Sequence, residues 1–496
     1  MYISFVLNEI LTSQFNWGVN EVNLKRVLTT TVAVALSAAI CSPAFATNGY
    51  FTHGVGTASK GMAGTGIGSN ADMGTIMAAS NPALGVFAGD RWEAGLSFFS
   101  PMRSYTASAS QLNGGLIPID PGNGVFLPSL TITPGEVDSS SELFFIPYVA
   151  KNWSLQNDAN VSLAFYGRGG MNTDWDDSSG AEATSYFCGG NPQAGEPPAT
   201  NSGPYCIGKS GVDLMQAFLA VNYSAKIGDN FSWGIGPVFA IQLFEANGVG
   251  TFAPITESFA ASGGTAFPTS LSNNGHDTST GFGFGAGLWW GISDSVSLGL
   301  AYQSKMSMSE FDDYADLFAE QGGFDIPSSI KAGLSFLATD KVRVNFDIEQ
   351  IAYSDVDSVA NPMANLVTCP TLPFGGTSLP NCLGGNAGGG FGWDDMTIYK
   401  LGVEWQRDEN STWRFGYSFG EQPIQAADVL FNILAPGIME QHLTLGLTRQ
   451  RANGGAWSFS FMYAPENTLT GPSMFDPTQT VELKMSQLEF EVGFSF

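Results

Sequence analysis

The C-terminal segment alternates apolar and polar residues without a break up to the final residue. Its apolar positions are Leu488, Phe490, Val492, Phe494 and Phe496, and its polar positions are Gln487, Glu489, Glu491, Gly493 and Ser495. Successive side chains of a strand point to opposite faces, so this segment has one apolar face and one polar face. Such a strand suits the wall of a barrel with lipid outside and a watery lumen inside.

The same period-two pattern recurs along the chain. Its clearest stripes are Val296–Tyr302, Val342–Ile348, Trp413–Phe419, Leu443–Leu447 and Trp457–Tyr463. A soluble β-sandwich also alternates and remains the alternative. Here the strands are long, aromatic residues gather near their ends, and only 13% of residues are charged, well below the roughly 25% of soluble domains. These features favour a transmembrane barrel.

The pattern predicts fourteen strands, an even number, as bacterial barrels prefer. They span 90–101, 142–153, 158–169, 211–228, 229–246, 278–292, 294–310, 326–338, 340–354, 394–408, 411–424, 437–451, 455–470 and 480–496. Short turns alternate with connections that are mostly long, namely 102–141, 170–210, 247–277, 311–325, 355–393, 425–436 and 471–479. Short turns belong to the periplasmic side and long loops to the outside. Helical apolar spacing predicts lids at Pro254–Ser262 and Phe311–Gln321.

The region before residue 47 is typical of a secretory signal peptide. Lys25 and Arg26 precede an apolar stretch, Val27–Ile40, and Ala44-Phe45-Ala46 forms an A-x-A cleavage site. We expect residues 1–46 to be a signal peptide with an upstream extension of the reading frame. An uncleaved anchor is the rival, but the apolar stretch is short of the roughly 20 residues that a span needs. Lipidation at Cys41 is disfavoured, because the bulky Ile40 does not suit a lipobox.

Four cysteines remain after the expected cleavage, and each pair lies in a Gly/Pro-rich stretch. Export through an oxidising compartment makes the local disulfides Cys188–Cys206 and Cys369–Cys382 the favoured pairing, although three connectivities are possible. A zinc site is the alternative, but no His or second Cys is spaced to complete it.

Composition and motifs disfavour two other classes of function. The net charge of -26 argues against a nucleic-acid binder, which would carry a basic patch. Most of the acidity is expected in solvated loops, and divalent cations near charged lipid heads are a weaker alternative. The three histidines, His53, His276 and His442, lie outside any G-x-S-x-G or H-E-x-x-H context. We therefore expect no enzyme, no catalytic residues, no metal and no cofactor.

Residues 47–89 differ from the rest, being rich in Gly, Ala and Ser and lacking strand alternation. A phosphate-binding loop is excluded, because GxxxxGK[ST] is absent. A flexible tail is one interpretation. A plug folded inside the barrel is the other, since small residues let backbone pack closely in a confined lumen. The expected organisation is a hatch at 47–89 and a barrel at 90–496.

Motifs in this order resemble the FadL-type outer-membrane transporter family across essentially the whole mature chain. They are Asn48 followed by aromatics, Ser59-Lys60-Gly61-Met62-Ala63-Gly64, Asn81-Pro82-Ala83, Tyr166-Gly167, Ile326-Pro327-Ser328-Ser329-Ile330-Lys331, Phe431–Gly437 and Glu440–Gly446. The resemblance implies a fourteen-stranded barrel plugged by an N-terminal hatch. It also implies passive uptake of long-chain fatty acids, with a branch of the family for aromatic hydrocarbons.

By this resemblance, apolar ligand is captured among the outer loops and leaves sideways through a gap at a kinked third strand. Tyr166-Gly167-Arg168-Gly169-Gly170 lies where that kink is expected, and glycines in a strand suit a bulge. An ordinary turn into the next loop is the alternative interpretation.

A fatty acid needs an apolar slot and a cation for its carboxylate. The alternation places Lys331, Arg343, Lys400 and Arg414 on the lumen face, so they are the candidate ligand-binding cations. The alternative is that each pairs with a lumen acid such as Asp347, Glu349 or Glu404. In the hatch, Tyr50 and Phe51 are candidates for packing against ligand, and Asn81-Pro82-Ala83 for a turn that holds the plug.

The sequence thus predicts a monomer in a Gram-negative outer membrane. Phe496, with apolar residues at every second position before it, resembles the signal read by the barrel-assembly machinery. The expected partners are a hydrophobic small molecule, outer-membrane lipid and lipopolysaccharide, and no nucleic acid. Aromatic or alkane hydrocarbons are the alternative substrates, and a general diffusion porin is the alternative class.

Overall fold

The computed structural model describes residues 48–112, 116–120, 125–175, 203–371, 376–452 and 454–496. The predicted signal peptide with its upstream extension, and Cys188, lie outside the described residues. Within these ranges, none of the helices has the length and apolar character needed to cross a bilayer.

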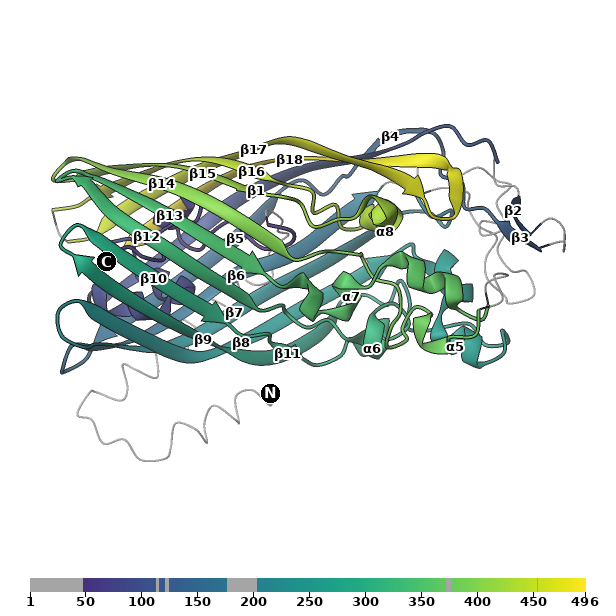
Figure 1. The fold of residues 1–496 in the computed structure, drawn as a ribbon, viewed down its shortest axis with the longest axis horizontal. Helices are drawn as coiled ribbons and strands as arrows, with labels where there is room; N and C mark the ends of the chain where they lie inside the picture. Colours follow the sequence, from purple (N-terminus) through teal and green to yellow (C-terminus); the bar gives the residue numbers. More distant parts are fainter. Residues whose placement is uncertain (1–47, 113–115, 121–124, 176–202, 372–375, 453) are drawn as a thin grey trace, which may run out of the picture. The chain divides into compact units, whose positions relative to one another are not determined.

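The described chain forms a closed antiparallel barrel of fourteen strands (Figure 1), which confirms the predicted fold class. The strands are β1 (Arg91–Ala107), β5 (Phe144–Ser154), β6 (Ala159–Trp175), β7 (Ser210–Lys226), β8 (Phe231–Asn247), β9 (Asp277–Ser293), β10 (Val296–Gln303), β12 (Ser329–Thr339), β13 (Val342–Ile351), β14 (Met396–Asp408), β15 (Ser411–Gly420), β16 (Gln441–Gln450), β17 (Ala456–Ser473) and β18 (Asp476–Ser495). Each pairs with its neighbours in sequence, and β18 pairs with β1 to close the wall.

Four shorter strands lie beside or outside this wall. β4 (Gly135–Asp138) extends the edge of β1, and β11 (Ser307–Met308) pairs with β9. β2 (Leu116–Asp120) and β3 (Val125–Pro128) form a separate hairpin. All four belong to long connections, so they leave the number of wall strands unchanged.

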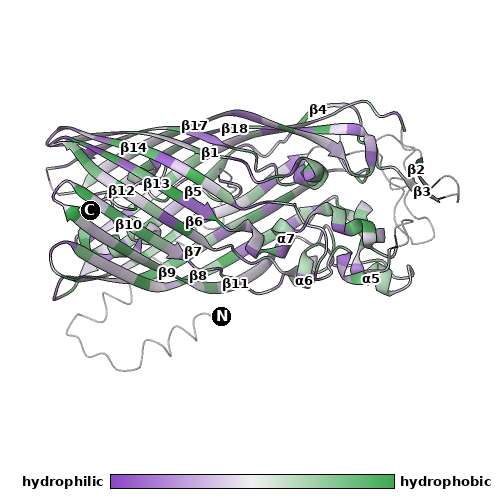
Figure 2. Cartoon of the chain, viewed as in Figure 1, coloured by the Kyte–Doolittle hydropathy of each residue, from purple (hydrophilic) through white to green (hydrophobic). Residues whose placement is uncertain are grey.

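The two faces of β18 follow the alternation in the sequence. Leu488 and Phe490 are 38% and 43% exposed on the outer face, whereas Gln487 and Glu491 on the inner face are buried. Figure 2 shows apolar residues interspersed with more polar ones along the strands of the wall. An apolar surface that surrounds the molecule would be unfavourable in water and favourable in lipid.

Short turns and the C-terminus lie at one end of the barrel, and the long connections lie at the other (Figure 1). The two predicted lids contain short helices. η2 (Gly250–Ile255) and α5 (Glu257–Ala261) occupy the first, and η3 (Asp312–Tyr314) and α6 (Ala319–Gly322) the second. The other helices of the long connections are η4 (Tyr353–Asp355), α7 (Asp357–Ala360), η5 (Met363–Thr368), η6 (Leu379–Asn381), η7 (Ala426–Asp428) and α8 (Val429–Asn432).

The prediction of a connection at 471–479 is wrong. β17 and β18 continue to Ser473 and Asp476, so only two residues join them. Pairs such as Gly471 with Val481 keep the two strands in register beyond the predicted strand ends. Gly471 and Pro472 suggested a break in the strand, but pairing with β18 keeps the segment extended.

The N-terminal segment lies inside the barrel and contains α3 (Thr57–Lys60), α4 (Met77–Ser80) and η1 (Pro82–Phe87). Glycines on the inner wall make room for it. A Cβ at Gly333 would lie 2.8 Å from Gly68 N, and a Cβ at Gly446 would lie 3.0 Å from Gly61 Cα. Backbone therefore packs on backbone between the hatch and the wall, where any side chain would push them apart.

Candidate functional site

The barrel wall is interrupted between β5 and β6. These strands pair from Ser154 with Asn160 up to Tyr148 with Tyr166, and in the described chain no pair follows. Beyond this point, Phe144–Pro147 of β5 and Gly167–Met171 of β6 flank an unpaired stretch, here called the β5–β6 gap. A register shift between Gly167 and Gly169 marks a bulge in β6 at the same level. The predicted third strand therefore does not end near residue 169 but continues to Trp175.

The wall closes again on the outer side of the β5–β6 gap. Ser139 forms a bridge with Trp175, and Ser140 N donates a hydrogen bond to Asp174 O at 2.8 Å. The gap is thus bounded on its four sides by β5, β6, the last β5–β6 pair and these outer contacts.

The hatch occupies the free edge of β6. Thr52 N donates to Arg168 O at 2.8 Å, and Gly170 N donates to Tyr50 O at 3.0 Å. Phe51 and Gly169 are the central pair of this antiparallel bridge. Residues Tyr50–Thr52, here called the plug strand, satisfy backbone groups that would otherwise face the lumen unpaired.

The two aromatic residues of the plug strand are buried. The Tyr50 ring centroid lies 5.2 Å from that of Tyr353 and 5.8 Å from that of Trp393. The guanidinium of Arg168 lies 4.5 Å from the centroid of the Phe51 ring, within the range of a cation–π contact. The predicted ligand-packing residues therefore lie at the seal of the gap.

An apolar pocket, whose about 440 Å³ of empty space includes open solvent, lies beneath the outer loops. Five phenylalanines contribute to it, and no lining residue is charged. Its lining includes Phe244, Phe252, Phe318, Phe391, Phe431 and Leu434. The walls come from β7, β8, the two lid connections, the 355–393 connection and the segment around α8. This uncharged lining suits contact with an apolar molecule or an alkyl chain.

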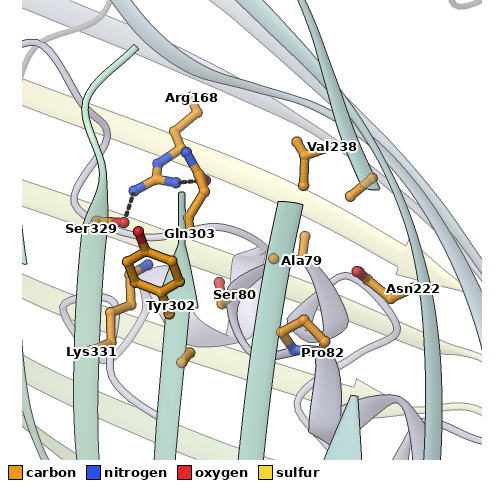
Figure 3. A pocket seen from close by; sticks show the side chains of 13 residues that line it. Ala79, Ser80, Pro82, Arg168, Asn222, Val238, Tyr302, Gln303, Ser329 and Lys331 are labelled. Atoms are coloured by element: carbon orange, nitrogen blue, oxygen red, sulfur yellow. Dashed lines mark hydrogen bonds between the residues drawn. The ribbon is translucent and has the colours of Figure 1, made fainter. Parts of the chain in front are cut away.

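A second cavity, of about 370 Å³, lies between the hatch and the wall. Arg168 and Lys331 line it opposite Ser80 and Pro82 of the hatch (Figure 3). Arg168 donates hydrogen bonds from Nη2 to Ser329 Oγ, at 3.1 Å, and from Nη1 to Gln303. This cavity presents cations, unlike the apolar one.

Three basic side chains converge on Glu349. Its carboxylate lies 2.7 Å from Lys400 Nζ, 3.2 Å from Lys331 Nζ and 3.7 Å from Arg168 Nη2. Lys400 also donates to His53 O of the hatch at 2.8 Å. The structure thus brings together two of the predicted cations, and adds Arg168, which the sequence suggested only as part of the kink.

The other two predicted cations lie apart from this cluster. Arg414 is buried and lies 2.8 Å from Glu404, and its Nη1 donates to Thr448 Oγ1 at 2.6 Å. Arg343 is half-buried and donates to Ser335 Oγ at 3.0 Å. The alternative considered for these cations was pairing with lumen acids. Lys331, Lys400 and Arg414 all have such a partner, namely Glu349 for the two lysines and Glu404 for Arg414.

The predicted hatch turn Asn81-Pro82-Ala83 holds the plug to the wall. Asn81 Oδ1 accepts from Ala83 N at 3.1 Å, which caps η1. Its Nδ2 donates to Ile67 O at 2.9 Å and to Leu288 O of β9 at 3.2 Å. One amide side chain thus joins two parts of the hatch to the barrel.

Lys60 is a further hatch residue that sequence reasoning did not single out. Its Nζ lies 2.5 Å from Glu489 Oε1 and 2.6 Å from Glu491 Oε2, both on the inner face of β18. The sequence signal for Lys60 was a basic residue inside a Gly/Ala-rich segment, together with two inward-facing acids on the last strand.

The loop cysteines Cys369 and Cys382 form the predicted disulfide. The other predicted pair, Cys188 with Cys206, involves a residue outside the described ranges. Among described residues, no group of three His, Cys, Asp or Glu side chains could hold a metal ion.

Residues 199–452 match the model of a family described as outer membrane protein transport protein (OMPP1/FadL/TodX). The search among curated proteins found no match. Among solved structures, the Pseudomonas putida toluene transporter TodX is 13% identical, with a TM-score of 0.58 over 90% of this chain and 99% of that one.

Two further solved structures share the fold. A Pseudomonas aeruginosa FadL homologue is 16% identical, with a TM-score of 0.58 over 90% of this chain and 99% of that one. The Ralstonia pickettii toluene transporter TbuX is 13% identical, with a TM-score of 0.52 over 88% and 98%.

Proposed function

The chain belongs to the OMPP1/FadL/TodX family of outer membrane transport proteins, and we propose that it imports long-chain fatty acids by passive diffusion through the plugged barrel. The ligand is captured beneath the outer loops, passes the plug strand and leaves sideways into the membrane through the β5–β6 gap. No bond is made or broken in this path, so it requires no catalytic group or cofactor.

The β5–β6 gap is the observation that carries this proposal. Lipopolysaccharide slows free diffusion of apolar molecules through the outer leaflet, and an aqueous channel solvates them poorly. A lateral gap delivers such a molecule to hydrocarbon without a passage through water. The plug strand is held to β6 by two backbone hydrogen bonds, which is a small set of contacts for a ligand to displace.

Capture begins in the apolar cavity beneath the outer loops. Contact with its aromatic lining removes apolar surface of the ligand from water. This burial stabilises the bound ligand by roughly 25 cal/mol per Å². Phe391 and Leu434 line this cavity, while Trp393 and Ala435, close to them in sequence, line a smaller one beside Tyr50. A ligand can therefore move from the loops towards the plug strand along two adjacent walls.

Arg168 and Lys331 support a carboxylate as the ligand head group. Both line the cavity between hatch and wall, and the side chain of Lys331 keeps 15% of its surface exposed. Lys400 and Arg414 are more deeply buried, at 3%. We therefore assign Lys331, rather than Lys400 or Arg414, to ligand binding.

Uptake of aromatic or alkane hydrocarbons is the second candidate function. The uncharged lining of the apolar cavity favours it, because a hydrocarbon needs no cation. Binding of oleate and toluene to the purified protein separates the two. Binding of oleate that Lys331→Met weakens supports the fatty acid, and binding of toluene alone supports the hydrocarbon.

Locking the plug strand tests the lateral path. Phe51 and Gly169 form a pair without direct hydrogen bonds, since the bonds run between the flanking residues. Such pairs have Cα atoms about 4.5 Å apart, within the range that a disulfide spans. We expect oxidised Phe51→Cys/Gly169→Cys protein to stop oleate uptake by cells, and reduction to restore it.

Wild-type protein under the same oxidant and reductant is the control, because reduction also opens native disulfides. The single variant Phe51→Cys controls for loss of the aromatic ring. Oleate uptake by the oxidised double variant at the wild-type rate would contradict displacement of the plug strand.

A further inference from the structure

Six basic side chains among the described residues are buried. They are Lys60, Arg103, Lys151, Arg168, Lys400 and Arg414. Five of them have a carboxylate oxygen within 4.0 Å. Arg103 has none within the described chain, although its side chain is as buried as the others. Burial of a charge is costly unless an opposite charge compensates it, so Arg103 is an exception that needs an explanation.

The hydrogen bonds of Arg103 go to backbone carbonyls instead. Nη2 donates to Ser141 O at 2.5 Å, and Nη1 donates to Asn172 O. Its Nε is buried and has no hydrogen-bond partner in the described chain. Besides these carbonyl groups, the Phe144 ring centroid lies 5.8 Å from the guanidinium, and Glu142 attracts it electrostatically without forming an ion pair.

Arg103 lines a small pocket beside the plug strand, whose about 220 Å³ of empty space includes open solvent. The rest of the lining is mostly apolar and includes Tyr50, Met171, Trp393, Pro436 and Met485. One of these residues, Tyr50, belongs to the plug strand, and Met171 flanks the β5–β6 gap. The site thus combines a buried guanidinium, which has no carboxylate within 4.0 Å in the described chain, with apolar walls at the point where ligand would meet the seal.

We propose that Arg103 binds the carboxylate of a long-chain fatty acid on the outer side of the plug strand. A planar guanidinium matches a carboxylate with two parallel hydrogen bonds, and the apolar walls contact the first carbons of the chain. The proposal rests on the proposed function and adds a head-group site to it. Arg103 is separate from Arg168 and Lys331, which line the cavity between hatch and wall.

The position of Arg103 also explains how the charged carboxylate of a fatty acid can follow its alkyl chain along a path with apolar walls. The large cavity beneath the loops holds the alkyl chain but offers no cation. Trp393 and Ala435 of the Arg103 pocket are close in sequence to Phe391 and Leu434 of the apolar pocket, so we expect the carboxylate to reach Arg103 while the chain remains in the apolar pocket. A hydrocarbon gains nothing at this step, which makes Arg103 a residue that selects between the two substrate classes.

Binding of oleate and methyl oleate to the purified mature protein tests the proposal, because the two share one chain and differ in charge. We expect Arg103→Gln to weaken oleate binding by roughly ten- to hundredfold, the usual effect of losing charged hydrogen bonds. Methyl oleate should bind equally to both proteins. Arg103→Lys keeps the charge and should restore part of the oleate affinity.

Arg449→Gln is the matched control, because Arg449 is an exposed arginine on β16, outside the three cavities. It should bind both ligands as the wild type does. Equal oleate binding by Arg103→Gln and wild type would overturn the proposal, and so would an equal loss of oleate and methyl oleate, which indicates a packing role.

The wild-type protein gives an answer even if Arg103→Gln does not fold. Binding of oleate no tighter than of methyl oleate by the wild type would overturn the role of Arg103 while leaving hydrophobic uptake intact. A wild type that binds and imports neither ligand would overturn the proposed fatty acid uptake as well.

Discussion

The hatch is held to the barrel by buried charged side chains from distant parts of the chain. Lys60 lies between Glu489 and Glu491, and Thr57 Oγ1 donates to Glu491 at 2.8 Å. Asp347 of β13 accepts hydrogen bonds from Gly66 N, at 2.7 Å, and Ile67 N, at 3.0 Å. The polar inner face of the strands therefore binds the hatch rather than lining an open channel.

Replacement of Lys60 should loosen the hatch. Lys60→Met leaves two buried carboxylates without their cation, and breaking a buried pair from one side costs about 3–5 kcal/mol. We expect a lower urea midpoint and faster proteolysis of the hatch. Lys484→Met is the control, because Lys484 pairs with Glu136 at an exposed site, where a pair contributes about 1 kcal/mol or less. Equal midpoints for the two variants would contradict the anchoring role.

His53 should make hatch stability depend on pH. Burial, assisted by Lys60 and Lys400 and opposed by Glu489, lowers the pKa of His53 to about 4, below the value of about 6.5 in an unfolded chain. Between these values the unfolded chain binds a proton that the folded protein does not, so stability is present above pH 6.5 and is lost as pH falls towards 4.

The neutral variant His53→Gln removes this dependence. From pH 7 to pH 5 we expect the wild type to lose about 2 kcal/mol more than His53→Gln in the free energy of unfolding by urea. The difference between the proteins isolates His53, because other titrating groups are common to both. Parallel pH profiles would show that His53 is not buried in its neutral form.

At the level of residues, the sequence predicted which face of a strand a side chain lies on, but not which side chain it pairs with. Alternation correctly placed Lys400 and Arg414 in the lumen, yet which acid each one meets depends on register and on the hatch. Arg103 was missed because the first strand was predicted to end at 101, whereas β1 continues to Ala107. Pro101 suggested a break, although Phe99, Arg103 and Tyr105 share the inward face.

Among the elements, the 355–393 connection is held in place by its disulfide. Leu383, next to Cys382, lines the apolar cavity, and its backbone bonds to Ile255 and Glu257 of the first lid. The disulfide thus constrains the segment that lines the cavity, and two backbone hydrogen bonds join this segment to the first lid.

Removal of this disulfide should impair capture without unfolding the barrel. We expect Cys369→Ser/Cys382→Ser to destabilise the ordered form of the connection by about 3 kcal/mol, the usual effect of removing a disulfide that closes a loop of this size. Limited proteolysis should then cleave within 355–393, and oleate uptake should fall. Heat-dependent migration in gels, which reports the closed barrel, should match the wild type. Unchanged proteolysis would show that the lid contacts suffice.

The strands themselves were predictable because lipid imposes one strict rule, an apolar side chain at every second position. The elements that differ from the prediction lie at strand ends and at the bulge of β6, where alternation alone does not determine the structure. The β17–β18 hairpin extends beyond the predicted strand ends, and β6 continues past its bulge because the plug strand and β7 pair with it. Glycines around 167–170 indicated a bend but not what would cover it.

At the level of the whole molecule, the presence of the hatch distinguishes a sealed transporter from a diffusion porin. Deletion of residues 48–89 should leave a folded barrel, because the strands pair with each other around the full ring. We expect liposomes with the wild type to exclude small sugars, and liposomes with the deletion variant to swell in them. Swelling with the wild type would favour the porin.

The chain joins its hatch to its last strand, and this has a consequence for the order of assembly. Lys60 and Glu489 are 429 residues apart, so this contact forms only when nearly the whole chain is in place. At Gly333 and Gly446 the wall backbone lies directly against the hatch backbone, so threading the hatch into a finished ring would have to pass these close contacts. We therefore expect the hatch to lie among the earlier strands when β18 arrives, and β18 then to complete the wall and secure the hatch in one step.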